Sequence, residues 1–515
     1  MDFQEKKGPE PDLYQTDSGP RLGQVTQVKN LRDFEEVPGI WNKVHLLSEK
    51  LGAETIGVEQ LPEEARNPNQ KPYSTFFVWT TANFHYSAFT TGALGPLLFG
   101  LGWWDSFLTI VFFNFIADLA PGVISYLGPT LGMRSMIIVR YSFGFWASKV
   151  IVLLNAITCI GWIVINTVAG GGLLYDASDA KMPLVVAIVI ILVVSLITSF
   201  LGYRAIHLYD RYGWLVLIVI SIIVVGFGGK HFVNVPMAKG DTARLGVLSY
   251  GALIISWGIT WVPLAADYSL YMPSKTPKWQ TFLWTFGGIY IGSTFAFFIG
   301  VALATLVSNP DPVYNFAAVY DDRGIGGLVG AIFEGHGTGT RGFGRFIEVM
   351  LSLSIIGANI PNIYSFGLSI QAISNWTQKI PRVLVTLLGF AVALTVSCIL
   401  RNRFVEALEN FLNILSYWCT PFAAVVLTEH FVFRRSIGYD QNAWRSPGSL
   451  PTGIAAFGSW ACGITAAFMG ADQTWLVGPI AKAIGGADIG WELGAAVGCT
   501  VYLVTRSIEL KFIGR

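Results

Sequence analysis

The sequence predicts an all-α polytopic membrane protein with about twelve transmembrane helices, each needing roughly 20 apolar residues to cross the hydrocarbon core. The chain of 515 residues is 53% hydrophobic and only 13% charged, whereas soluble domains carry about 25% charged residues. Two of the apolar runs place polar residues, glycine and proline at mid-membrane depth. A regular helix that faces lipid does not have this composition.

The expected spans follow the apolar runs along the chain. They cover residues 75–100, 104–128, 150–175, 182–202, 212–230, 246–271, 281–307, 345–375, 383–400, 406–430, 451–472 and 489–508. The first 70 residues are polar and lack the apolar core of a secretory signal, so we expect a mostly disordered tail. The expected organisation is therefore a cytoplasmic tail (1–70), a ten-helix core (71–430) and two additional helices with a short C-terminus (431–515).

The distribution of lysine and arginine predicts the orientation in the membrane, because cytoplasmic loops are enriched in positive residues. The connections that follow the even-numbered spans contain most of the positive residues in short loops. They are Arg134, Arg140, Arg204, Arg211, Lys275, Lys278, Lys379, Arg382, Arg434, Arg435 and Arg445. Both termini are accordingly expected in the cytoplasm.

Composition and motifs argue against several function classes. The formal net charge is +1, so nothing indicates a nucleic-acid partner. The five cysteines lie in or beside apolar runs without a CxxC pair, and we interpret them as small buried hydrophobic residues without a metal role. We find no HExxH, GxSxG or nucleotide-binding motif, and therefore expect neither an enzyme nor a cofactor.

The first and sixth spans are expected to be broken. The first contains ANFHYSAFTTGALGP (82–96) and the sixth contains SWGITWVPLAAD (256–267). Proline removes a backbone donor, and glycine lowers the cost of unwinding. These spans occupy matching positions in two sets of five. Paired interruptions of this kind indicate a midplane substrate site in a transporter built from inverted repeats.

Aromatic and amide side chains are expected to meet at that site. Trp162 and Asn166 lie four residues apart and share one helix face, although a tryptophan and an asparagine also serve as helix-packing residues in membranes. Span eight contributes Asn359, and Trp261 lies beside the break in span six, whereas we assign Trp257 to packing. Two indole rings can hold a flat heteroaromatic molecule, and an amide can both donate to and accept from its edge.

Four blocks resemble the purine–cytosine permeases of fungi, in the nucleobase–cation symporter family. They are FFNFIADLAPGVISYLGPTLGMRSMIIVRYSFG, CIGWIVINTVAGGGLL, WVPLAADYSLYMP and GANIPNIYSFGLSIQAIS. The resemblance implies a five-plus-five, LeuT-like core that imports cytosine and purines such as adenine, guanine and hypoxanthine with protons across the plasma membrane. It implies substrate contacts from Ser87, Trp162, Asn166, Trp261, Asn359 and Pro361.

The resemblance also raises two open questions. Asp210 matches an acidic position linked in the family to gating, but it is equally consistent with a solvated carboxylate near Arg211.

The family often has two consecutive asparagines before IPN, and here the first is Ala358. Transport of another flat heterocycle, such as a vitamin, therefore stays open, as does a channel or nutrient sensor on the same fold.

Proton coupling is favoured over sodium coupling because span eight offers at most one hydroxyl, Ser354, where sodium-coupled relatives use several. Acids within the membrane are functional suspects. Asp267 and Glu348 are our coupling candidates, with Asp118 and Glu409 as further intramembrane acids. For Asp267 the alternative is a carboxylate that caps a helix or pairs near Lys275.

Overall fold

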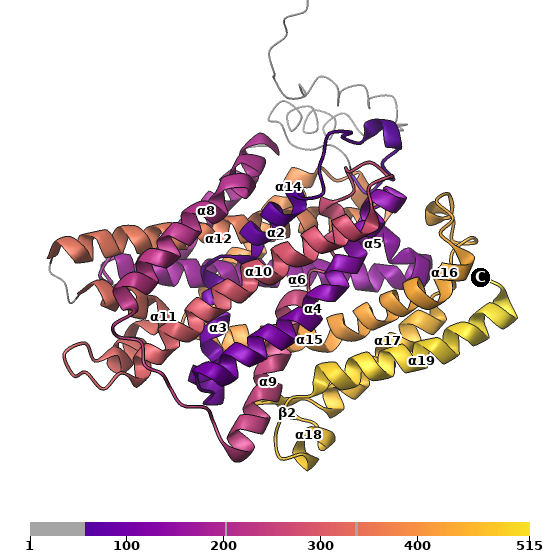
Figure 1. Cartoon of the computed structure of the whole chain (residues 1–515). Helices are drawn as coiled ribbons and strands as arrows, with labels where there is room; N and C mark the ends of the chain where they lie inside the picture. The colour runs from indigo at the N-terminus through magenta and orange to yellow at the C-terminus, as the bar shows by residue number, and fades with distance from the viewer. Residues whose placement is uncertain (1–56, 201–202, 335–337) are drawn as a thin grey trace, which may run out of the picture. The chain divides into compact units, whose positions relative to one another are not determined.

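The computed structural model describes residues 57–515 apart from 201–202 and 335–337; at 200, 203–211, 338 and 375 it describes the backbone only. The described residues fall within one unit, Gly39–Arg515, which consists mainly of helices (Figure 1). The predicted all-α polytopic fold is confirmed. Most of the predicted tail, residues 1–56, lies outside the described residues.

Helices lie in the described parts of the chain where apolar spans are expected. Eight are long and apolar enough to cross a membrane: α4 (Trp103–Leu131), α6 (Arg140–Ala177), α9 (Gly240–Ile259), α10 (Lys278–Thr305), α12 (Thr338–Ile373), α14 (Arg382–Leu400), α15 (Phe404–Thr428) and α19 (Gly490–Ile513). Three contain shorter apolar stretches: α7 (Leu184–Phe200), α8 (Tyr203–Gly228) and α17 (Ile454–Met469). The first expected span contains α2 (Ser74–Asn83) and α3 (Tyr86–Phe99).

The remaining helical elements are mostly short, apart from α11 (Phe316–Glu334). The short ones are η2 (Glu63–Ala65), α5 (Ser135–Ile138), η3 (Ala265–Tyr268), η4 (Leu306–Ser308), α13 (Asn375–Gln378), the π-helical turn η5 (Glu429–Phe433), α16 (Arg434–Ile437), η6 (Ala443–Arg445) and α18 (Pro479–Ala483). Two short antiparallel strands, β1 (Asp472–Gln473) and β2 (Leu476–Val477), pair Asp472 with Val477 and Gln473 with Leu476.

The first span changes direction between α2 and α3. Phe84 and His85 leave the helical region, and His85 is fully extended (φ −152°, ψ 169°). Helix α3 continues through Pro96. Proline cannot donate to the carbonyl four residues earlier, which is that of Gly92, and the Tyr250 hydroxyl donates to this carbonyl instead at 3.0 Å.

The sixth span is also interrupted, in a stretch that contains glycine and proline. Helix α9 ends at Ile259, and a series of turns leads to the 3-10 helix η3. Trp261 and Leu264 continue this path through turn hydrogen bonds, from Trp261 N to the Gly258 carbonyl at 3.2 Å and from Leu264 N to the Trp261 carbonyl at 3.0 Å. Pro263 lies in this stretch, where its missing donor is not needed.

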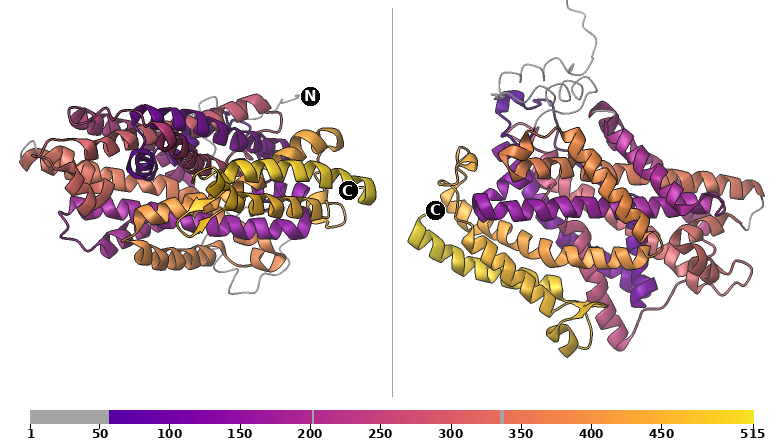
Figure 2. Two further views of the ribbon diagram at one scale, coloured as in Figure 1. Left: turned by 90° about the horizontal axis from the view of Figure 1, so that it is seen from below. Right: turned by 180° about the vertical axis from the view of Figure 1, so that it is seen from behind.

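Several helices pack closely in pairs around the two interrupted spans. Helix α6 packs along α12, and α3 packs against α10. Helices α17 and α19 run side by side next to α15, as both views in Figure 2 show. The interrupted α2–α3 and α9–η3 segments contribute many of their side chains to the largest buried apolar cluster.

Part of the predicted tail is fixed against the helices. The backbone N–H of Leu61 donates to the Gly132 carbonyl at 2.8 Å. The buried Arg66 side chain donates to the carbonyls of Pro129 and Leu61. Residues 57–70 therefore cover the end of α4 because their backbone and arginine satisfy its terminal carbonyls.

Candidate site at the interrupted helices

Asn83 joins the two interrupted spans through one amide oxygen. It is the last residue of α2, and its Oδ1 accepts hydrogen bonds from the indole N–H of Trp257 at 2.8 Å and of Trp261 at 2.9 Å. Its own amide nitrogen donates to the Trp79 carbonyl at 2.9 Å. An sp² oxygen has two lone pairs, so this contact fills the acceptor capacity of the amide.

The tryptophan rings of three helices form a connected cluster around this amide. Trp162 of α6 contacts Trp257 edge-to-face, with centroids 4.9 Å apart and planes at 79°. Trp261 contacts Trp79 of α2 in the same manner, at 5.0 Å and 72°. Trp162 and Trp261 are each 7% exposed. The ring beside Trp162 is thus Trp257, and Trp261 is linked to it through Asn83.

The two predicted amides are in direct contact. Asn166 of α6 donates to Oδ1 of Asn359 of α12 at 3.1 Å, and Asn359 donates to the Ser195 hydroxyl of α7 at 3.1 Å. Both amides are buried, and Asn166 Oδ1 has no hydrogen-bond partner among the residues that the structure describes. An acceptor is therefore available one helical turn from Trp162.

Pro361 and Ser87 are both buried. Pro361 lies within α12, and the side chain of the next residue, Asn362, donates to the Ala358 carbonyl at 2.8 Å. Ser87 lies in the first turn of α3, is fully buried, and has a hydroxyl without a partner within the described part of the chain. Asp210 belongs to α8, but its side chain lies outside the described residues.

Asp267 is a helix-capping residue in this structure. Its Oδ1 accepts from the backbone N–H of Ser135, the first residue of α5, at 2.7 Å. The Ser135 hydroxyl in turn accepts from the backbone N–H of Ala266 at 2.9 Å. This reciprocal pair connects η3 to α5, and carboxylates are stabilised at helix N-termini.

Glu348 belongs to a buried ion-pair network at the ends of α6, α11 and α12. Arg341 contacts Glu348 at 2.6 Å and Asp176 at 3.3 Å, while Arg323 contacts Asp176 at 2.9 Å. The Glu348 and Asp176 carboxylates are fully buried. At the edge of the network, a hydrogen bond from Arg345 lowers the pKa of Asp179. No contact described for Glu348 reaches the tryptophan cluster.

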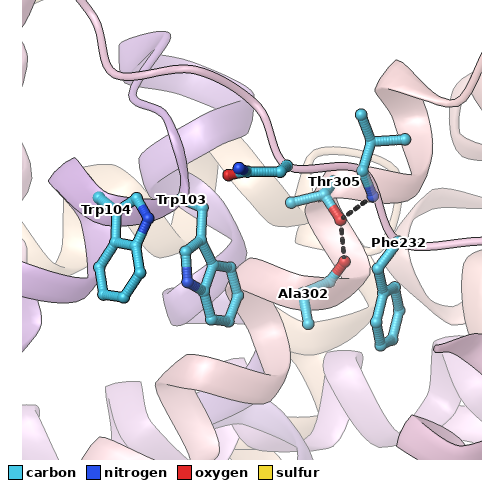
Figure 3. A pocket seen from close by; sticks show the side chains of 7 residues that line it. Trp103, Trp104, Phe232, Ala302 and Thr305 are labelled. Atoms are coloured by element: carbon cyan, nitrogen blue, oxygen red, sulfur yellow. Dashed lines mark hydrogen bonds between the residues drawn. The ribbon is translucent and has the colours of Figure 1, made fainter.

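A separate pocket of about 350 Å³ lies between the start of α4 and the end of α10. Figure 3 shows Trp103 and Trp104 on one side and Phe232, Ala302 and Thr305 on the other. The Thr305 hydroxyl donates to the Ala302 carbonyl at 2.7 Å and accepts from the Val233 N–H at 3.3 Å. None of the predicted site residues lines this pocket.

The described residues contain no group of three histidine, cysteine or acidic side chains placed to hold a metal ion. The five cysteines are free, and two of them, Cys159 and Cys419, are buried. The contacts of the tryptophan cluster are ring contacts and amide hydrogen bonds.

Residues 60–494 match a family described as permeases for cytosine and purines, uracil, thiamine and allantoin. This chain belongs to that permease family. A purine-cytosine permease of Emericella nidulans is 34% identical over 476 residues, which cover 92% of each chain. A vitamin B6 transporter of Saccharomyces cerevisiae is 30% identical over 535 residues and is similarly covered, 92% of this chain and 91% of that protein.

The permease shares its fold with a solved nucleobase-cation-symport-1 family transporter, determined in a closed conformation with bromovinylhydantoin bound. The TM-score is 0.68 at 15% sequence identity, over 89% of this chain and 96% of that one. The predicted family is thus confirmed, together with the transporter fold and the multi-pass membrane assignment. The relatives are transporters rather than enzymes.

In the permease, the cluster includes two residues that the sequence patterns did not single out for the site. Asn83 appeared only within the polar stretch 82–96, and Trp257 was expected to serve packing, whereas the structure brings Asn83 into contact with Trp261 and Trp257 into contact with Trp162. The sequence did contain a signal that Trp257 belongs with Trp261, because the two residues lie four positions apart. Their common acceptor is 174 residues away from Trp257, and no local pattern indicates such a contact.

Proposed function

We propose that this permease takes up cytosine and purine bases, including adenine, guanine and hypoxanthine, together with protons. Its substrate site lies at the interrupted spans and is exposed to each side of the membrane in turn. The support for the substrate class is the family membership and the purine-cytosine permease relative that covers 92% of the chain.

The observation that carries this proposal is the cluster of indole rings around the two helix interruptions together with an available amide acceptor, Asn166 Oδ1, one helical turn from Trp162. Trp162 and Trp261 are the proposed stacking residues, and base–aromatic stacking contributes about 1–3 kcal/mol per base. Asn166 offers an unoccupied Oδ1 to an exocyclic amino group, which cytosine and adenine both carry. Asn359, Ser87 and Pro361 complete the proposed site.

The proposed transporter resides in the plasma membrane with both termini in the cytoplasm. Residues 71–430 form the transport core, and residues 431–515 add two helices. Asp210 is the proposed gating residue, and Asp267 and Glu348 are the proton-coupling candidates indicated by the sequence. Uptake against a gradient that a protonophore abolishes supports symport, whereas downhill flux alone favours a channel and binding without flux favours a sensor.

Substitution of the two site tryptophans tests the substrate site. Trp162→Ala and Trp261→Ala should each abolish saturable uptake of labelled cytosine at normal surface expression, because each removes one stacking surface. Trp460→Ala is the control, since Trp460 is also 7% exposed but bonds to the Trp418 carbonyl beside α17. An unchanged apparent affinity in either site variant would refute the proposed stacking.

A vitamin-like flat heterocycle is the second candidate substrate. It is favoured by Ala358, which is fully buried next to Asn359 where the family often has a further amide, and by the vitamin B6 transporter relative. Competition of labelled cytosine uptake by purines, pyrimidines and vitamin B6 compounds separates the two. Strong competition by vitamin B6 with weak competition by bases would make the vitamin-like heterocycle the first candidate substrate and the nucleobases the second.

A further inference from the structure

Asp118 is a buried acid whose carboxylate is left without a partner. It lies midway along α4, and its side chain is completely buried. Neither carboxylate oxygen has a hydrogen-bond partner, and no arginine or lysine in the described part of the chain forms an ion pair with it. An ionised carboxylate in such surroundings is strongly disfavoured, because no side chain or backbone group in the described part of the chain compensates for its lost hydration.

The neighbours of Asp118 place it next to the substrate site. A Cβ atom at Gly258 would overlap its Oδ1, so the carboxyl group packs against the backbone of α9. Gly258 follows Trp257, and its carbonyl accepts the turn hydrogen bond from Trp261 N. The acid thus touches the segment in which α9 ends and from which both indoles reach Asn83.

The titratable groups on neighbouring elements do not neutralise this carboxylate. Tyr290 of α10 interacts with it electrostatically, but the Tyr290 hydroxyl donates to the Val111 carbonyl at 3.2 Å. The other such groups have their own contacts. Tyr250 of α9 donates to the Gly92 carbonyl, and Asp267 of η3 accepts from the Ser135 N–H. Tyr86 of α3 interacts electrostatically with Asp176 and Glu348. Glu429 after α15 pairs with Arg434 and Arg506.

The other two acidic candidates, Asp267 and Glu348, differ from Asp118 because their carboxylates have partners. The Asp267 carboxylate accepts a backbone N–H, and Glu348 is paired with Arg341. Both contacts stabilise the ionised form. Asp118 has no such contact within the described chain, so the packing around it favours the neutral acid.

We propose that Asp118 carries the coupled proton. In the packed arrangement seen here the carboxylic acid is neutral and lies against Gly258. When the α9 segment moves away to open the site, water reaches the carboxyl group, the O–H bond breaks and the proton leaves to that side. The same displacement moves the Trp257 and Trp261 rings, which couples proton release to release of the base. This inference rests on the proposed proton symport.

Reconstituted full-length protein in liposomes tests the proposal, with a pH-sensitive dye inside and labelled cytosine outside. Wild-type protein should show both cytosine counterflow and cytosine-driven proton influx. Asp118→Asn preserves the shape of the neutral acid and should keep counterflow while losing proton influx. Asp241→Asn, on the exposed first turn of α9, should keep both activities.

The outcomes separate the two proposals. Counterflow without proton influx in wild-type liposomes would refute proton symport itself. Proton influx that persists in Asp118→Asn, or is lost in Asp267→Asn instead, would overturn the assignment of Asp118 alone. Infrared spectroscopy of wild-type protein labelled at aspartate provides a second measurement if Asp118→Asn does not fold. The absence of any protonated aspartate band at neutral pH would then refute the assignment.

Discussion

At the scale of single residues, Asn83 fixes the positions of two indole rings. Both N–H groups point to the same oxygen from residues four apart, although the segment between them is not a regular helix. Buried indole N–H groups need a partner, and this amide at the end of α2 supplies it. The hydrogen bonds therefore hold the two interrupted spans in a defined relative position.

Asn83→Ala is expected to weaken cytosine transport because it leaves two buried donors unsatisfied, each at a cost of about 1–3 kcal/mol. We expect a rise in the apparent KM of at least about tenfold, since one factor of ten corresponds to about 1.4 kcal/mol. Uptake kinetics measured at equal surface expression test this expectation.

The matched control is Asn155→Ala. Asn155 is also buried, and its amide joins α6 to Ser369 of α12 at 2.9 Å, with no hydrogen bond to a tryptophan in the described chain. A similar rise in apparent KM for both variants would show that Asn83 acts through general helix packing.

At the scale of helices, α3 and α10 approach each other through glycine. A Cβ atom at Gly300 would overlap the Phe89 carbonyl, and one at Gly92 would overlap the Phe297 carbonyl. Small residues at such crossings let helix backbones touch, which is a main source of stability between membrane helices. This contact holds the second half of the first span against α10.

Gly300→Ala should lower the stability of the purified protein by about 1–3 kcal/mol, the usual cost of overpacking. Gly287→Ala on the same helix is the control, because a Cβ atom there meets its nearest neighbour, Phe76, at an ordinary 3.7 Å. Thermal unfolding in detergent measures both. Equal midpoints for the two variants would contradict the proposed backbone contact.

At the scale of the whole helical unit, buried charges tie separate spans together near helix ends. Arg341 bridges Asp176 of α6 and Glu348 of α12, and Arg323 brings α11 into the same network. A second network joins Glu429 to Arg434 and Arg506. Removing one member of a buried pair leaves an uncompensated charge, which is more costly than losing an exposed pair.

Arg341→Ala should therefore destabilise the protein by about 3–5 kcal/mol, because two fully buried carboxylates lose their shared partner. Arg345→Ala should cost about 1 kcal/mol or less, since the Arg345 side chain is 44% exposed and pairs with the partly exposed Asp179. Surface abundance and thermal unfolding distinguish the two. A mild effect of Arg341→Ala would mean that the acids are neutral rather than paired.

Hydropathy and local chemistry determined much of this protein from the sequence alone. Apolar runs of membrane length predicted the spans, because burial of a helix in lipid depends on its own composition. Polar residues near Asn83 and the Gly258–Pro263 region marked the two interruptions, since backbone propensity acts locally. The four sequence blocks indicated the permease family, and the comparison confirmed it.

The tertiary structure decided which of these residues meet. It brought Asn83 to Trp257 and Trp261 and placed Trp257 beside Trp162. It also left the Asp118 carboxyl group against Gly258 without a partner in the described chain. These contacts join residues more than 90 positions apart, and their geometry depends on how helices cross. Periodicity within one helix cannot specify it, because the face that a residue occupies does not identify the helix opposite.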